Sequence, residues 1–184
     1  GEHAACEIMR AAHGGRVVVA TSHGNDFAEA LQDLADVGVT ANTLASNVTA
    51  VMVQHLARRN CTQCRVSVSL TPEQVAAVLP GDPPELHSQF EGQGCDHCSG
   101  TGYEGRTLVV EFLPGSPALR AALRRGIVPH DLSAIARQNG LLSLRDSAIE
   151  LVRAGDITLA ELGNVLTAEQ REVGTGSSRA GVCS

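Results

Sequence analysis

Two short stretches decide how this chain can fold: Cys61-Thr-Gln-Cys64 and Cys95-Asp-His-Cys98, which are separated by 30 residues. Each stretch places two thiols three positions apart, a spacing typical of the knuckles that hold Zn²⁺ in a tetrahedron of sulfur ligands. The alternatives are two disulfides or four thiols without a shared role. Because paired spacing of this kind seldom arises by chance, we predict a structural zinc site formed by Cys61, Cys64, Cys95 and Cys98.

The composition of the chain indicates the surroundings of that site. Hydrophobic residues make up 43% of the 184 positions, which is enough for a core, but aromatic residues make up only 2%, so the core must consist of Leu, Val and Ala. No apolar run reaches the length of a membrane span, and the N-terminus lacks the pattern of a secretory signal. We therefore expect a reducing cytoplasmic setting, in which cysteine pairs favour metal over disulfides.

The charged residues argue against a P-loop within this sequence and against binding of nucleic acid. All 14 basic residues are Arg, and the formal net charge is −6. A sequence without Lys contains no P-loop lysine, and the pattern Gly-x-x-x-x-Gly-Lys-Ser/Thr does not occur in it. An acidic balance argues against non-specific binding of nucleic acid, which depends on a basic surface. We expect no nucleic-acid partner.

On the N-terminal side of the cysteines, the sequence predicts helices around one strand. A short helix over 7–13 precedes a continuous apolar run at 16–20, which is typical of a buried strand in a parallel sheet. Asp26 is placed to cap a helix that Gly38 ends. A longer amphipathic helix is expected from about Ala41 to Arg58.

Between and after the cysteine pairs, strands and helices are expected to alternate. The pattern predicts a half-exposed strand from Arg65 to Leu70, a helix start at Thr71-Pro-Glu-Gln74, and a strand from Arg106 to Phe112. Four helices follow, and their predicted N-caps are Ser116, Asp131, Ser143 and Thr158. A capping box is expected between the last of these and Glu161.

The loop that follows the predicted buried strand is a candidate ligand site. In open α/β sheets, ligands bind beyond the carboxyl ends of the strands, and His23 lies at such a place. Its ring can donate a hydrogen bond to a phosphate oxygen, while the alternative is an ordinary polar loop in which Asp26 only caps the next helix. By itself, a terminal carboxylate such as Glu2 is usually a solvated charge.

Several segments, in order along the chain, resemble the C-terminal half of the ATPases of type II secretion and type IV pilus assembly. They correspond in turn to the end of that family's Walker B element, its histidine box, the entry and exit of its tetracysteine module, and its C-terminal helices. The matching segments are Gly1-Glu2, Val17–Asp26, Val53–Cys64, Cys95–Thr107, Leu144–Asp146 and Ala154–Glu161.

The resemblance implies an α/β fold: a partial RecA-like P-loop ATPase core with a Cys₄ zinc module as an insertion and a C-terminal helical cap. It divides the chain into the end of the core (1–60), the tetracysteine module (61–105), a strand with the helical subdomain (106–167) and a disordered tail (168–184). The module is expected to project freely as a contact surface, while the helices from Ser116 to Leu166 close the core.

The resemblance also implies roles for individual residues and partners. Glu2 corresponds to the glutamate that activates water, His23 to the histidine near the γ-phosphate, and the four cysteines to zinc ligands. ATP and Mg²⁺ are implied only for a complete ATPase. The family's subunits form hexamers at the inner face of the cytoplasmic membrane, where they work with inner-membrane platform proteins to power pilus or pseudopilus assembly.

This sequence departs from the family's pattern at three places. His3-Ala4-Ala5 stands where the family usually has Ile-Arg-Asp, Arg16 stands where it often has His, and Ser22-His23-Gly24 replaces Leu-His-Thr. Phosphoryl transfer depends on Lys and Mg²⁺ ligands that are not found in this sequence. We therefore expect no ATP hydrolysis by this chain alone, which then belongs to a longer protein or is a degenerate paralogue.

Two other classes stay open. The pattern Cys95-x-x-Cys98-x-Gly100-x-Gly102 matches one repeat of the cysteine-rich region of DnaJ chaperones, but that region needs several such repeats. The first cysteine pair instead continues as Arg65-Val66, without Gly. The other class is a zinc-stabilised interaction module without catalytic activity. A P-loop upstream in the reading frame would exclude both.

Overall fold

The structure is a computed structural model that describes residues 2–22, 24, 26–81, 84–126, 129–138 and 141–166; for residues 2, 3, 129–131, 133 and 134 it describes the backbone only. The chain divides into two compact units, of which unit 1 comprises residues 1–54 and 110–143 and unit 2 comprises residues 55–109 and 144–184. Among the described residues, no helix is both long and apolar enough to cross a membrane.

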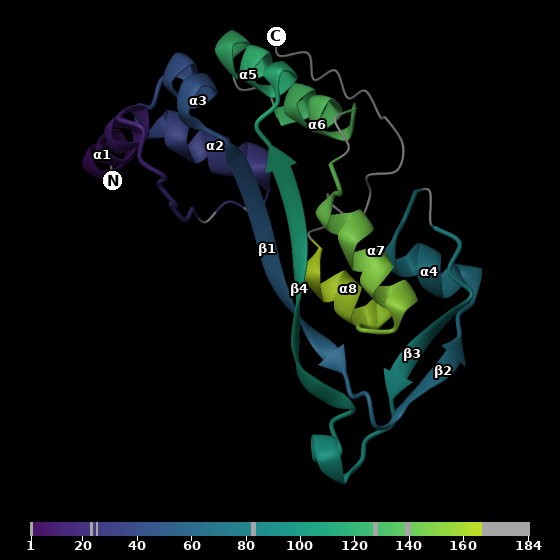
Figure 1. The fold of residues 1–184 in the computed structure, drawn as a ribbon. Coiled ribbons are helices and arrows are strands. Elements are labelled where there is room, and N and C mark those ends of the chain that lie inside the picture. Colours follow the sequence, from purple (N-terminus) through teal and green to yellow (C-terminus); the bar gives the residue numbers. More distant parts are fainter. Residues whose placement is uncertain are drawn as a thin grey trace. The chain divides into compact units, whose positions relative to one another are not determined.

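Unit 1 is a group of helices around an apolar core. Its helices are α1 (Glu2–His13), α2 (Phe27–Asp36), α3 (Ala41–Asn47), α5 (Pro117–Arg125) and α6 (Pro129–Gln138), shown in Figure 1. The core is made of aliphatic side chains, because the sequence supplies few aromatic ones, and its most deeply buried members include Leu31, Leu44, Leu119, Leu123 and Leu132.

The helix ends of unit 1 follow the capping signals of the sequence. The carboxylate of Asp26 accepts a hydrogen bond from the backbone N–H of Glu29 at 2.7 Å, and α2 begins at the next residue. The hydroxyl of Ser116 accepts one from the N–H of Leu119 at 3.1 Å. These two caps are confirmed, whereas α1 begins five residues earlier than predicted, and Asp131 lies inside α6 because that helix begins at Pro129.

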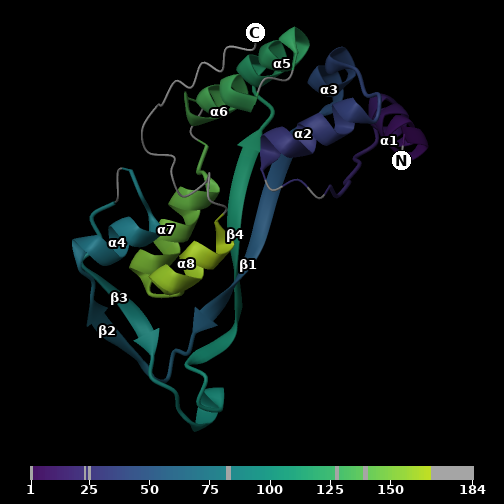
Figure 2. The ribbon, with the colours of Figure 1, turned by 180° about the vertical axis from the view of Figure 1, so that it is seen from behind.

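The described strands form two sheets of two strands each. β1 (Ala50–Asn60) pairs with β4 (Tyr103–Pro114), and their arrows point in opposite directions in Figures 1 and 2. β2 (Arg65–Ser69) pairs antiparallel with β3 (Ser88–Gly92). β2 and the central part of β4 are confirmed predictions, but β3 was not predicted, because its sequence Ser-Gln-Phe-Glu-Gly has few of the β-branched residues that indicate strands.

Unit 2 packs the segment between the cysteine pairs against the last two helices. Its helices are α4 (Pro72–Val78), the short 3₁₀ turn η1 (Asp96–Cys98), α7 (Leu144–Ala154) and α8 (Leu159–Val165). Val75 of α4 and Val109 of β4 share one core with Ile149, Ile157 and Leu162. The expectation that the C-terminal helices leave the module free is therefore wrong for α7 and α8, which provide the apolar face that the small module needs.

Two further expectations are wrong in unit 1. The run 16–20 is not a strand, and Val17 and Val19 are 96% and 90% exposed. Among the described residues no strand lies beside this run to pair with it, and a buried parallel strand requires such neighbours.

The predicted helix from Ala41 to Arg58 is also wrong in its second half, since α3 ends at Asn47 and β1 begins at Ala50. Burial along β1 alternates with a period of two, which leaves Met52 and Leu56 exposed and buries Val53 and Ala57. β-Branched residues at Val48, Thr49, Val51 and Val53 favour this strand over a helix.

Candidate metal centre

The four cysteines lie at the ends of strands and turns of unit 2 and converge on one point. Cys61 directly follows β1, Cys64 directly precedes β2, and Cys95 and Cys98 bracket the start and end of η1. All four Sγ atoms lie within 4.8 Å of one another. Among the described residues, they are the one group of three or more Cys, His, Asp or Glu ligand atoms that converges in this way.

The distances between the sulfur atoms fit a tetrahedral metal centre. Sγ of Cys61 lies 3.9 Å from that of Cys95, Cys64 lies 3.9 Å from Cys98, and Cys95 lies 3.8 Å from Cys98. A tetrahedron with Zn–S bonds of about 2.3 Å has sulfur–sulfur edges of about 3.8 Å. Disulfide-bonded sulfur atoms lie about 2.0 Å apart. The observed spacing therefore fits a shared metal and not a pair of disulfides.

Backbone hydrogen bonds hold both knuckles in place. The N–H of Arg65 donates to the carbonyl of Cys61 at 3.1 Å and closes the first turn, and the N–H of Gly100 donates to the carbonyl of Cys95 at 2.9 Å and closes the second. The N–H of Cys61 donates to the carbonyl of Gly102 at 2.9 Å, which ties the two knuckles together.

Gly102 must be glycine at this point. Its φ is +76°, and a Cβ there would lie 2.4 Å from the carbonyl oxygen of Gly92. The turn after Cys98 therefore requires glycine at position 102, because two backbones are in close contact there.

The surroundings of the sulfur atoms favour one thiolate and oppose another. The pKa of Cys98 is lowered to about 6, chiefly because the backbone N–H of Cys95 donates to its Sγ at 3.2 Å; burial acts in the opposite direction, and the N–H of Gly102 adds a second bond at 3.2 Å. Burial raises the pKa of Cys64 to about 12. Four crowded sulfur atoms cannot all carry negative charge without a cation among them, which is the chemistry of a Cys₄ metal site.

The second knuckle carries a partly exposed polar pair, His97 and Glu104. His97 lies between the second pair of cysteines, and its Nε2 is 2.9 Å from a carboxylate oxygen of Glu104. The hydrogen bond from this carboxylate raises the pKa of His97, and the same bond lowers the pKa of Glu104. His97 therefore has a partner of its own and does not replace a cysteine.

The predicted catalytic residues are not part of this centre. His23 lies outside the described residues, and for Glu2 the structure describes only the backbone, as the first residue of α1. Their roles stay predictions.

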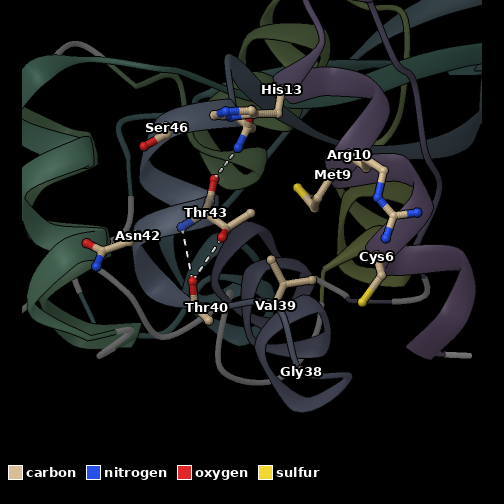
Figure 3. A pocket seen from close by; sticks show the side chains of 11 residues that line it. Cys6, Met9, Arg10, His13, Gly38, Val39, Thr40, Asn42, Thr43 and Ser46 are labelled. Carbon is tan, nitrogen blue, oxygen red and sulfur yellow. Dashed lines mark hydrogen bonds between the residues drawn. The ribbon is translucent and has the colours of Figure 1, made fainter.

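A separate hollow of about 490 Å³ lies in unit 1, between α1 and the segment that contains α3. Figure 3 shows Cys6, Met9, Arg10 and His13 of α1 on one side and Thr40 and Thr43 on the other. Within the described part of the chain, its lining holds no converging set of three metal-ligating groups.

Sequence reasoning missed the residues that surround the first knuckle. Asn60 and Glu161 are polar but only 0% and 6% exposed, and they bond Gly155 and Arg58, which lie 95 and 103 positions away in the chain. Thr158 does cap α8, but Glu161 bonds Arg58 where a capping box was predicted. Local periodicity cannot show such long-range partners.

Fold and site together define a mixed α/β chain with a four-cysteine cluster, and comparison with known proteins identifies its family. The family described as Type II/IV secretion system protein matches residues 2–164. The chain belongs to this family, which confirms the resemblance seen in the sequence.

Individual relatives agree with the family assignment. The type IV pilus assembly ATPase PilB of Thermus thermophilus is 33% identical over 149 residues, covering 80% of this chain and 17% of that protein. The type II secretion system protein HxcR of Pseudomonas aeruginosa is 33% identical over 148 residues (80% and 28%). The putative type II secretion system protein E of Escherichia coli is 30% identical over 154 residues (84% and 31%). The chain thus spans less than a third of the length of these relatives.

Proposed function

We propose that this chain is the C-terminal part of a motor ATPase subunit that powers pilus or pseudopilus assembly. The observation that carries the proposal is the four-cysteine cluster of unit 2 in a chain whose family match runs over residues 2–164. In this proposal residues 1–60 belong to a RecA-like core, and the ATP and Mg²⁺ sites are completed by parts of a longer protein.

The four thiols would hold a structural zinc ion. Cys61 and Cys64 supply one pair of ligands and Cys95 and Cys98 the other, and zinc would supply the positive charge that lets all four sulfur atoms ionise. Purified without chelator, the chain should contain about one zinc per molecule with Zn–S distances of about 2.3 Å. A folded, metal-free sample with four reactive thiols contradicts this part of the proposal.

ATP hydrolysis should require residues beyond this chain. We expect the chain alone to show no ATPase activity, and turnover near about 1 per second would contradict that expectation. In a longer protein that carries a P-loop, Glu2→Gln and His23→Ala should lower turnover, since they correspond to the water-activating and γ-phosphate residues. Normal turnover in both variants would favour the alternative, a degenerate paralogue or non-catalytic interaction module.

We further propose that the parent subunits form a hexamer and act at the inner face of the cytoplasmic membrane, with platform proteins as partners and the metal knuckles as a contact surface. Deleting residues 65–94 cannot test this contact, because Val75, Leu79 and Leu86 belong to the core of unit 2. Exposed positions on the knuckles are better suited, namely Gln63 and Asp96.

The contact is tested with Gln63→Arg and Asp96→Arg in the full-length protein. Reduced subunit association in sedimentation, or reduced recovery with membranes that carry the platform protein, is expected for these variants with zinc content unchanged. The control is Asn42→Arg, an exposed change in unit 1. Equal association of all three variants with the unmodified protein contradicts a docking role for the knuckles.

A further inference from the structure

We infer that Gly155 is a positioning residue for the first cysteine knuckle, so that metal binding and the docking of α7 and α8 depend on each other. The inference rests on the proposed metal centre and adds to it a residue that is far away in sequence. Gly155 directly follows α7 and begins the turn to α8, and it lies 91 positions after Cys64.

Both flanks of the first knuckle bond the same carbonyl group. Asn60, which directly precedes Cys61, donates from Nδ2 to the carbonyl oxygen of Gly155 at 3.0 Å. Arg65, which directly follows Cys64, donates from its guanidinium group to the same oxygen at 2.9 Å. One acceptor therefore fixes the two residues between which the first pair of ligands is held.

Further hydrogen bonds attach this turn to β1 and β3. The backbone N–H of Asn60 donates to the carbonyl of Asp156 at 2.7 Å, and its Nδ2 also donates to the carbonyl of Phe90 at 2.8 Å. The backbone N–H of Leu159 donates to Oε1 of Gln89 at 2.6 Å. Asn60 is fully buried, so each bond that it loses leaves a polar group without water to replace the partner.

Position 155 admits only glycine for two independent reasons. Its φ is +78°, which other residues adopt only with strain. A Cβ there would lie 2.5 Å from Cδ2 of Phe90 and 3.3 Å from a guanidinium nitrogen of Arg65. Alanine at this position must therefore displace the Phe90 ring, and it also crowds the Arg65 guanidinium group that bonds this turn.

Mutual dependence follows from linkage. If the turn at Gly155 places Cys61 and Cys64 for the metal through its bonds to Asn60 and Arg65, then breaking those bonds weakens metal binding. Removing the metal must then weaken the packing of this turn by the same factor. The metal would then hold together residues 61–98 and the helices α7 and α8, although β4, α5 and α6 separate these two segments in the sequence.

The test compares Gly155→Ala with Gly38→Ala in the full chain. Gly38 also has a positive φ, +91°, but a Cβ there meets nothing within 4 Å, so this control carries the backbone strain without the contact. Zinc affinity is measured by competition with a chromophoric chelator. We expect a loss of about tenfold or more in Gly155→Ala, the size typical of residues that orient metal ligands, and a change below about twofold in Gly38→Ala.

Two further measurements keep the inference open to refutation if Gly155→Ala folds poorly. Arg65→Gln leaves the backbone unchanged and should weaken zinc binding in the same direction. In the unmodified chain, stripping zinc should speed hydrogen exchange at the amides of α8 more than at those of α3. The inference is overturned, and the metal centre left intact, if both Gly155→Ala and Arg65→Gln bind zinc as tightly as the unmodified chain does. Equal hydrogen exchange of α8 with and without zinc overturns it as well. A folded chain that binds no zinc overturns both.

Discussion

Unit 1 leaves Val17 and Val19 almost fully in water, whereas unit 2 buries even the polar residues Asn60 and Glu161. The apolar run of unit 1 has no strand beside it within the described residues. In unit 2, these two polar side chains bond distant parts of the chain: Asn60 Nδ2 donates to the carbonyl of Gly155, and Arg58 donates to Glu161 across 103 positions. Apolar pattern alone thus does not determine burial, because a segment is buried only where the rest of the chain supplies its neighbours.

The difference between unit 1 and unit 2 is tested most strongly by removing one of the metal ligands. Cys98→Ser should abolish stoichiometric zinc binding and unfold much of unit 2, because structural zinc contributes folding free energy directly. Hydrogen exchange should show lost protection in β2, β3 and α8, and less change in α2 and α3. Serine at exposed Cys6 is the matched control and should change neither property. Equal loss of protection in both units would show that they fold as one.

A smaller effect is expected from the ion pair between Arg58 and Glu161. Glu161 accepts hydrogen bonds from the backbone N–H and from the guanidinium group of Arg58, at 2.8 to 3.0 Å. Glu161→Ala removes these bonds and leaves the Arg58 N–H without this acceptor, which should cost about 2 kcal/mol of unfolding free energy. Denaturant titration measures the change.

The control is Glu150→Ala, which removes an exposed pair with Arg153 on α7 and should cost less than about 0.5 kcal/mol. A Glu161→Ala cost as small as that of the control would show that the long-range pair does not hold α8.

The same carboxylate predicts how stability depends on pH. Burial raises the pKa of Glu161, but the hydrogen bonds from Arg58 outweigh burial, so the pKa in the folded chain lies below its ordinary value. Such a group contributes stability above its unfolded pKa of about 4.3 and loses that contribution as the pH falls through the folded pKa. The stability difference between the unmodified chain and Glu161→Gln should therefore be constant at neutral pH and shrink in acid.

Both proteins keep the four cysteines and all other carboxylates, so the comparison isolates Glu161. Unfolding free energies between pH 7 and about pH 3 measure the effect. A difference that grows as the pH falls would contradict the lowered pKa.

Features that depend on residues close together in the sequence were predicted correctly. The caps at Asp26, Thr71 and Ser116 and the meeting of the four thiols follow from spacing over a few residues or from a repeated motif. The long-range contacts of Gly155 could not be predicted in this way, since glycine after a helix indicates only a C-cap. Predicted roles of residues 1–60, 61–105 and 106–167 within a whole motor subunit stay predictions.

Errors in the fold arose where one pattern fits two structures. Leu44, Val48, Met52 and Leu56 recur at helical spacing, yet Val51, Val53 and Ala57 alternate in the same stretch, and pairing with β4 favours the strand. The run at 16–20 has the composition of a buried strand, but a strand also needs neighbours that its own sequence does not encode.

The smallest expected effect concerns that exposed run. Val17→Thr and Val19→Thr keep the β-branched shape and add a hydroxyl, and because both side chains are at least 90% exposed, each should change the unfolding free energy by less than about 0.5 kcal/mol. Val53→Thr is the matched control, since Val53 is only 7% exposed and lies in the core of unit 1. Burying a hydroxyl there should lower the unfolding free energy by more than about 1 kcal/mol. Denaturant unfolding of the three variants measures these changes. A large loss at Val17 or Val19, equal to that at Val53, would show that the run is packed in solution and that the contrast between this run and the buried polar residues of unit 2 does not hold.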